Sequence, residues 1–121
     1  MARGDFSHLE IPANDPSAVL PFYEAVFGWE FGQMEAFGEY HLFRMASSNA
    51  GGAIGRRGVT AGDRLDVAIE VESIEEALAA ATRTGGSVVR GKAEVTGFGW
   101  SATIADPEGG QISIFEPARA G

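Results

Sequence analysis

The sequence repeats itself at an offset of 58 residues, and this repeat constrains the fold more than any other feature. Sliding the chain against itself by that distance aligns its two halves without a gap. The matched pairs are Gly4 with Gly62, Asp5 with Asp63, Ile11 with Ile69, Leu20 with Leu78, Gly28 with Gly86, Gly51 with Gly109, Gly52 with Gly110 and Ile54 with Ile112. Because glycines often mark where elements end, their recurrence predicts two similar units, at about residues 4–58 and 62–117, within a single domain.

The first half has the pattern of a strand, a helix and three further strands. Alternating apolar residues predict a strand over residues 6–12, and Asp15 followed by Pro16 marks the start of a helix over residues 15–27. Gly28 suits the left-handed conformation that ends many helices. The expected apolar stripe of this helix is Val19, Phe22, Tyr23, Val26 and Phe27. The three expected strands cover residues 29–34, 39–45 and 52–57, and the glycine-rich run at 49–55 predicts a hairpin turn.

The second half repeats this order. A strand is expected over residues 67–71, and Ser73 with Glu76 three residues later has the spacing of a capping box for a helix over residues 73–84. The expected buried stripe of this helix is Ile74, Ala77, Leu78 and Ala81. Strands follow at 87–90, 98–105 and 111–116, and the last two are joined by the turn at 106–110.

Composition narrows the classes of function. The 121 residues suit one domain, and the formal charge of −8 disfavours binding to nucleic acid or to anionic membranes. The chain has no cysteine, and it shows no apolar leader segment or membrane-length run, so we expect a cytoplasmic protein. An anionic small molecule remains compatible with this charge, because Arg44, Arg56 or Arg57 could bind it locally.

Two phrases carry a family resemblance. They are residues 22–29, with the sequence FYEAVFGW, and residues 105–110, with the sequence ADPEGG. With the two β-α-β-β-β units, they resemble the glyoxalase/bleomycin-resistance/dioxygenase (vicinal oxygen chelate) superfamily. The resemblance implies an α+β fold in which two βαβββ units form paired curved sheets around a cleft. A ferredoxin-like domain is the main structural alternative.

The resemblance also implies a site for a divalent metal such as Ni, Zn, Mn or Fe. Its ligands would come from the first and last strands of each unit, and three of these four positions hold His8, Asp66 and Glu116. Alternatively, Glu116 could act as the catalytic base, with His8 and Asp66 as the ligands. Gly58 stands at the fourth position and offers no side chain. Asp66 also departs from the family pattern, in which His or Gln is usual there.

Strand alternation supports part of this site independently. If Leu9 and Ile11 pack under the helix, His8 must lie on the opposite face of its strand, and the same argument applies to Asp66. Glu10 shares the face of His8 and is a further candidate ligand. All of these side chains also have ordinary structural interpretations, as hydrogen-bonded or solvated residues at strand positions.

Aromatic and basic residues of the middle strands are candidates for binding a substrate. These candidates are Phe98, Trp100, His41 and Arg44, and Tyr40 and Phe43 lie on the same strands. Aromatic rings suit a flat or apolar small ligand, although some of them must belong to the core.

The resemblance favours a glyoxalase-like, metal-assisted isomerase or lyase that acts on a small oxygen-rich or thiol-conjugated substrate. Two alternatives are a non-catalytic, drug-sequestering binding protein, which the missing ligand at Gly58 favours, and an extradiol-type dioxygenase, which Asp66 disfavours. A third is a fold retained only for protein association. Members of the superfamily often dimerise, so a homodimer is expected. No Ser-His-Asp arrangement or phosphate loop is visible in the sequence.

Overall fold

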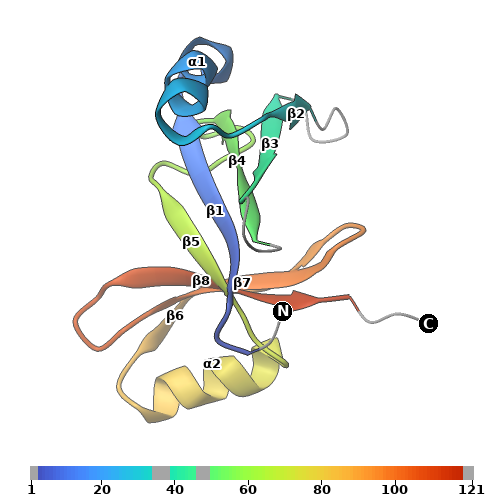
Figure 1. Ribbon diagram of the computed structural model, residues 1–121. Helices are drawn as coiled ribbons and strands as arrows, with labels where there is room; N and C mark the ends of the chain where they lie inside the picture. The colour runs from blue at the N-terminus through green and yellow to red at the C-terminus, as the bar shows by residue number, and fades with distance from the viewer. Residues whose placement is uncertain (1–2, 34–38, 46–49, 119–121) are drawn as a thin grey trace. The chain divides into compact units, whose positions relative to one another are not determined.

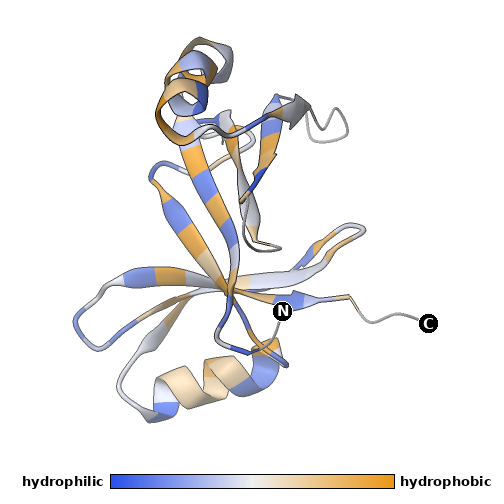
Figure 2. Cartoon of the chain, viewed as in Figure 1, coloured by the Kyte–Doolittle hydropathy of each residue, from blue (hydrophilic) through white to orange (hydrophobic). Residues whose placement is uncertain are grey.

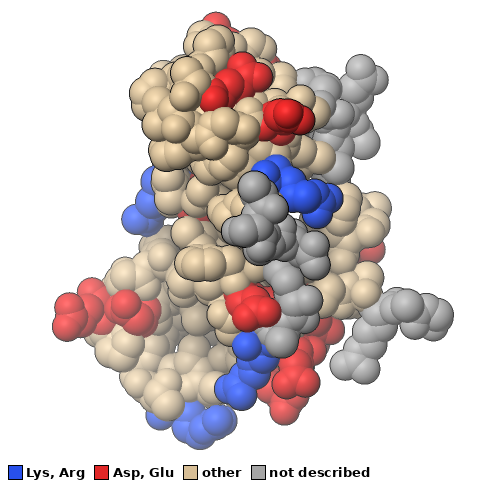
Figure 3. Space-filling model, in the orientation of Figure 1, with Lys and Arg blue, Asp and Glu red and all other residues tan. Residues whose placement is uncertain are grey.

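The computed structural model describes residues 3–33, 39–45 and 50–118, and it divides into two compact units. The N-terminal unit comprises residues 8–66, and the C-terminal unit comprises residues 67–121 together with residues 1–7. Figure 1 labels the elements of both units, and Figure 3 shows the acidic and basic side chains in the same view. In the described part of the chain, no helix is long and apolar enough to cross a membrane.

The N-terminal unit is a mixed four-stranded sheet with one helix. Its elements are β1 (Phe6–Ala13), α1 (Pro16–Phe27), β2 (Gly32–Gln33), β3 (Tyr40–Arg44) and β4 (Gly51–Arg56). The strand order is β2-β3-β4-β1, with β1 parallel to β4 and the other pairs antiparallel. Gly28 ends α1 at φ 73°, in the predicted left-handed conformation.

The C-terminal unit repeats this plan. Its elements are β5 (Asp66–Glu70), α2 (Ile74–Arg83), β6 (Ser87–Val95), β7 (Gly99–Ala105) and β8 (Gln111–Pro117). The strand order is β5-β8-β7-β6, and β5 runs parallel to β8. The Ser73 hydroxyl accepts a hydrogen bond from the Glu76 backbone N–H at 3.2 Å, as the capping-box spacing predicts. The predicted α+β fold of two βαβββ units is therefore confirmed, whereas the domain bounds and the cleft stay predictions.

Each unit has its own apolar core between helix and sheet. In the N-terminal unit Ile11, Ala13, Phe43 and Ile54 form the core. In the C-terminal unit Ile74, Ala102 and Ile114 form it, with Ala77 and Leu78 of α2 packed against them as predicted. Figure 2 shows the alternation of polar and apolar residues along β1 that puts one face of this strand in the core.

The predicted stripe of α1 is partly wrong. Val19 and Tyr23 pack against the core, but Phe22, Val26 and Phe27 are more than half exposed. The helix is rotated so that Leu20, which was not in the predicted stripe, also faces the core. Helical spacing identifies an apolar set but does not fix which part of it meets the sheet, because α1 is apolar around much of its circumference.

Two further predictions need correction, one of a strand and one of a turn. Residues 29–31 are not a strand, because Trp29 stacks flat on Phe43 with ring centroids 3.9 Å apart, and Phe31 packs on the same ring. Residue 34 of that predicted strand lies outside the described residues. The run at residues 51–55 is not a turn but lies in β4, where a Cβ on Gly52 would be 2.0 Å from the Leu9 carbonyl oxygen.

Candidate functional site

The polar face of the N-terminal sheet carries the main cluster of reactive side chains. Leu9 and Ile11 pack with the α1 core, so His8 and Glu10 lie on the opposite face of β1, as predicted. The β3–β4 and β1–β4 registers place Tyr40 on that same face. We call this surface, which α1 does not cover, the open face of the N-terminal unit.

Tyr40 joins His8 to Glu10. Its hydroxyl lies 2.7 Å from Glu10 Oε2 and 2.9 Å from His8 Nε2. The imidazole and phenol rings are nearly parallel, with centroids 6.3 Å apart and an interplanar angle of 9°. His8 Nε2 and Glu10 Oε2 are 3.7 Å apart, so the three groups form one compact polar cluster.

Partial burial tunes the protonation of this cluster. Burial by itself raises the pKa of Glu10. This effect is outweighed by hydrogen bonds from His8 and Tyr40, by the charge of His8 and by a backbone hydrogen bond from Gly62. The pKa of Glu10 is therefore held below its ordinary value. Burial, and then the charge of Glu10, raises the pKa of Tyr40 far above its ordinary value, so the phenol keeps its proton.

Arg44 lies in the same row of the open face as His8. Both residues pair with Gly51, His8 through β1–β4 and Arg44 through β3–β4. The Cα atoms of His8 and Arg44 are two strand spacings apart, which is roughly 10 Å. Gly51 lies between them and has no side chain. The Arg44 side chain is exposed, and no hydrogen bond or ion pair joins it to another residue that the structure describes. This arginine can therefore receive an anionic group beside His8.

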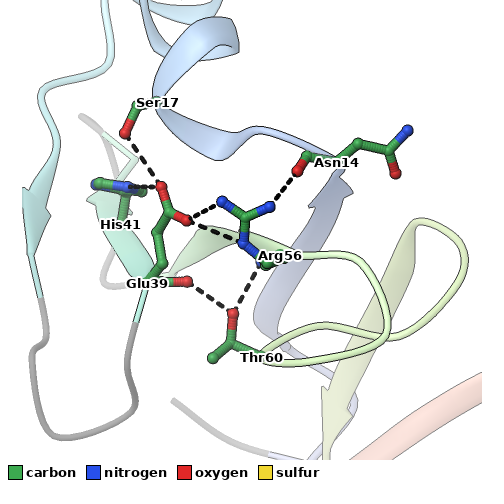
Figure 4. Close-up of polar contacts among 6 residues, drawn as sticks. All are labelled: Asn14, Ser17, Glu39, His41, Arg56 and Thr60. Atoms are coloured by element: carbon green, nitrogen blue, oxygen red, sulfur yellow. Dashed lines mark hydrogen bonds and ion pairs between the residues drawn. The ribbon is translucent and has the colours of Figure 1, made fainter.

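His41 lies in a different place from Arg44, on the face of β3 that α1 covers. Figure 4 shows its imidazole beside the Glu39 carboxylate, with Nε2 3.7 Å from Glu39 Oε2. Arg56 donates to Glu39 Oε1 at 2.7 Å, and Ser17 of α1 donates to Glu39 Oε2 at 3.1 Å. The Arg56 guanidinium holds the pKa of Glu39 below its ordinary value. This second cluster ties the start of α1 to β3 and β4, and His41 does not lie beside His8.

Glu116 is held at the start of helix α2. Its Oε1 accepts a hydrogen bond from the Ile74 backbone N–H at 2.9 Å. Ile114, two residues earlier on β8, lies in the core with Ile74, so Glu116 is on the helix-covered face of its sheet. The family resemblance had instead implied that Glu116 shares one site with His8 and Asp66. The structure gives this carboxylate a capping role, since the first N–H groups of a helix have no partner within the helix.

The two aromatic candidates of the C-terminal unit have different surroundings. Trp100 packs against the Ile74 core, and the Lys92 ammonium lies 4.9 Å from its ring centroid. Phe98 is 47% exposed and precedes β7, with its backbone N–H bonded to Val95. Trp100 therefore belongs to the core of its unit, while a binding role for Phe98 stays a prediction.

Asp66 and Gly58 complete the predicted set. Asp66 is the first residue of β5 and is half-buried. Gly58 follows β4 in a tight turn at φ 74°, where its N–H donates to the Ala61 carbonyl. A glycine at this position is explained by the left-handed turn, in which other residues are strained.

Comparison with known proteins places this architecture in a family. The model of the family described as "Glyoxalase-like domain" matches residues 8–115. The chain belongs to the glyoxalase-like domain family. This assignment confirms the resemblance to the vicinal oxygen chelate superfamily that the sequence indicated. The glyoxalase-like match covers almost all of both units.

Two groups of relatives resemble this glyoxalase-like domain. "Putative glyoxylase CFP32" of Mycobacterium bovis and of Mycobacterium tuberculosis are each 29% identical over 111 residues, which cover 90% of this chain but 42% of theirs. The chain therefore spans less than half the length of these relatives. A hypothetical protein from Bacillus halodurans C-125 has a similar fold, with a TM-score of 0.74 and 14% sequence identity; the match covers 98% of this chain and 97% of that protein. Methylmalonyl-CoA epimerase from Mycobacterium tuberculosis also has a similar fold, with a TM-score of 0.70 and 16% identity; the match covers 98% of this chain and 92% of the epimerase.

The metal that the superfamily resemblance implies can be tested against the donor atoms. Among the residues that the structure describes, no three His, Asp or Glu side chains gather closely enough to hold a metal ion. His8 Nε2 is engaged by Tyr40, and Glu116 Oε1 is engaged by Ile74. The predicted ligand set does not fit a metal with its side chains held in this way, and no chemical step is assigned to one.

The link between Tyr40, His8 and Glu10 was not predicted from the sequence. Strand alternation placed Glu10 beside His8 on the correct face, whereas Tyr40 was expected only as an aromatic residue of a middle strand. The contact joins residues 30 and 32 positions apart in the chain. Alternation gives the face of each residue but not the register between strands, so one sequence carries no signal for this contact.

Proposed function

We propose that this chain is a glyoxalase-like isomerase or lyase that moves a proton next to a carbonyl group of a small, oxygen-rich or thiol-conjugated substrate. The observation that carries the proposal is the cluster of His8, Tyr40 and Glu10, with Arg44 in the same row of the open face. The names of two relatives, "Putative glyoxylase CFP32" and methylmalonyl-CoA epimerase, support this class.

His8 is the proposed acid–base group. Removal of a proton from the carbon next to a carbonyl leaves negative charge on the carbonyl oxygen. The product is an enolate, or an enediolate where that carbon also carries a hydroxyl, and the reaction ends when a proton returns at a different position or on the opposite face. Imidazole is the side chain most often used for such transfers, and one positioned acid–base group contributes about 10²–10⁴-fold to rate. His8 is about one-third exposed, so a substrate can reach it.

Arg44 is the proposed group for substrate charge. A guanidinium offers a planar set of donors that matches a carboxylate or an enediolate oxygen. It is exposed and lies across Gly51 from His8, so an anionic end bound to Arg44 places the adjoining carbon toward His8. Stabilising charge that develops at oxygen is usually a large contribution to catalysis of this kind.

Isotope exchange tests the proposal directly. The probes are the hemithioacetal of methylglyoxal with glutathione, which is a thiol conjugate, and methylmalonyl-CoA, a ligand of a structural relative. Each is incubated in D₂O with the protein, with and without Ni, Zn, Mn or Fe(II), and loss of the proton next to the carbonyl is followed by NMR. We expect exchange with at least one probe, and a drop of about 100-fold or more in His8→Asn.

Matched variants separate the site from general damage. Arg44→Gln should raise KM more than it lowers kcat if the arginine mainly binds the substrate, whereas His41→Asn should exchange at the parent rate. If neither probe exchanges in the parent under any condition, the enzymatic proposal fails. Binding of a probe without exchange would instead favour the non-catalytic binding protein, and consumption of O₂ with Fe(II) would favour the dioxygenase.

A further inference from the structure

The Tyr40 hydroxyl has one proton, and Glu10 and His8 are among its polar neighbours. Glu10 Oε2 lies 2.7 Å from the phenol oxygen, and His8 Nε2 lies 2.9 Å from it. A phenol donates one hydrogen bond and accepts others, while an ionised carboxylate only accepts. The positions of the protons in this cluster can therefore be deduced from the chemistry of the three groups.

The Tyr40 proton belongs on the side of Glu10. A distance of 2.7 Å suits an O–H donor to a carboxylate, and 2.9 Å suits an N–H donor to oxygen. The opposite arrangement would direct the phenol proton at His8. The Glu10 carboxylate oxygen would then face the lone pairs of the phenol oxygen at 2.7 Å with no proton between them. Two acceptors in contact at a partly buried place, with no hydrogen bond between them, are unfavourable.

His8 must then donate from Nε2. The phenol oxygen offers a lone pair to that nitrogen, and the Glu10 carboxylate at 3.7 Å attracts the same N–H. We propose that Tyr40 and Glu10 are positioning residues that hold neutral His8 as the Nε2–H tautomer, so that Nδ1 carries the lone pair that accepts the substrate proton. The last part of this inference rests on the proposed function, while the tautomer itself does not.

This assignment explains the poor fit of His8 to the predicted metal site. Metal ligation needs a nitrogen lone pair, and in this tautomer Nε2 has none to give. Any ion bound by His8 must use Nδ1, or must first break the hydrogen bond to Tyr40. The open face therefore favours proton transfer by the imidazole over ligation through Nε2.

Imidazole ¹⁵N NMR of the parent chain at neutral pH tests the inference without a substrate. The chain has two histidines and two tyrosines, so His41→Asn assigns the His8 signals and Tyr23→Phe is a matched control for Tyr40→Phe. We expect His8 to show a protonated Nε2 and an unprotonated Nδ1, with a slowly exchanging Nε2 proton. Tyr40→Phe should speed the exchange of that proton with water, and Tyr23→Phe should leave it unchanged.

The outcomes separate the two proposals. A protonated Nδ1 with an unprotonated Nε2 in the parent would overturn the inference, as would a Tyr40→Phe spectrum identical to the parent in chemical shift and proton exchange. Loss of the slow Nε2 proton in Glu10→Gln, in a variant with unchanged circular dichroism, would support it independently. If the tautomer is as stated but no probe exchanges its proton, the proposed function fails and the tautomer assignment stands.

Discussion

Replacing Glu116 tests whether this carboxylate caps a helix or serves a reaction. In Glu116→Ala the Ile74 N–H loses its partner at 2.9 Å, and the Ile74 side chain is fully buried, so water reaches the vacated site poorly. A hydrogen bond to a charged acceptor is worth about 1.5–3 kcal/mol, and its loss leaves a donor unsatisfied. Negative charge at a helix N-terminus adds about 0.3–1 kcal/mol. We expect a loss of about 2 kcal/mol in the free energy of unfolding.

The assay is equilibrium unfolding in urea, monitored by circular dichroism, and the parent and all variants are fitted with one shared m-value. Glu116→Gln keeps an acceptor oxygen and loses only the charge, so it should cost less than about 1 kcal/mol. Ser73→Ala removes the other cap of α2, which serves the separate Glu76 N–H, and should cost about 1 kcal/mol. Glu108→Ala, at an exposed turn, should stay within about 0.5 kcal/mol of the parent.

One result would refute the capping argument. If Glu116→Ala unfolds at the parent urea concentration while losing proton exchange with the probes of the proposed function, the carboxylate serves the reaction and not α2. An equal loss of stability in Glu116→Ala and Glu116→Gln would show that the charge, and not the hydrogen bond, is the stabilising feature.

Three further predictions concern the N-terminal unit. The pKa of Glu10 is lower in the folded state than its ordinary value of 4.5, so the ionised carboxylate stabilises the fold above pH 4.5. This stabilisation is lost as the pH falls through the pKa of the folded state. The stability of Glu10→Gln should therefore depend less on pH than that of the parent below about pH 4.5. Gly52→Ala should lower the free energy of unfolding in urea by about 3 kcal/mol, because its Cβ would lie 2.0 Å from the Leu9 carbonyl oxygen. Gly32→Ala is the control and should lower it far less, because a Cβ at Gly32 meets nothing within 4 Å. Arg56→Met removes a half-exposed ion pair with Glu39 and should lower the free energy of unfolding only slightly, with a smaller difference in high salt.

Local chemistry made much of the fold predictable from the sequence. The Gly28 cap, the Ser73 cap and the alternation along β1 depend on residues within a few positions of one another, and each has the predicted conformation or face. The same locality put His8 and Glu10 on one face, because successive side chains of a strand point in opposite directions. The repeat at 58 residues then extended this plan to the second unit.

The tertiary structure decided what local patterns leave open. Strand register brought Tyr40 between His8 and Glu10 and placed Arg44 across Gly51, and no local spacing encodes these pairings. Packing also turned α1 so that Phe22 is exposed.

Glu116 shows the limit most clearly. Its strand was predicted correctly, but alternation gives only relative faces, and a shift of one residue reverses them all. The Ile114 contact with α2 fixed which face is covered, and the Ile74 N–H gave the carboxylate its partner. The sequence by itself determined the order of the elements and most of their bounds, while contacts between distant segments determined which polar side chains meet.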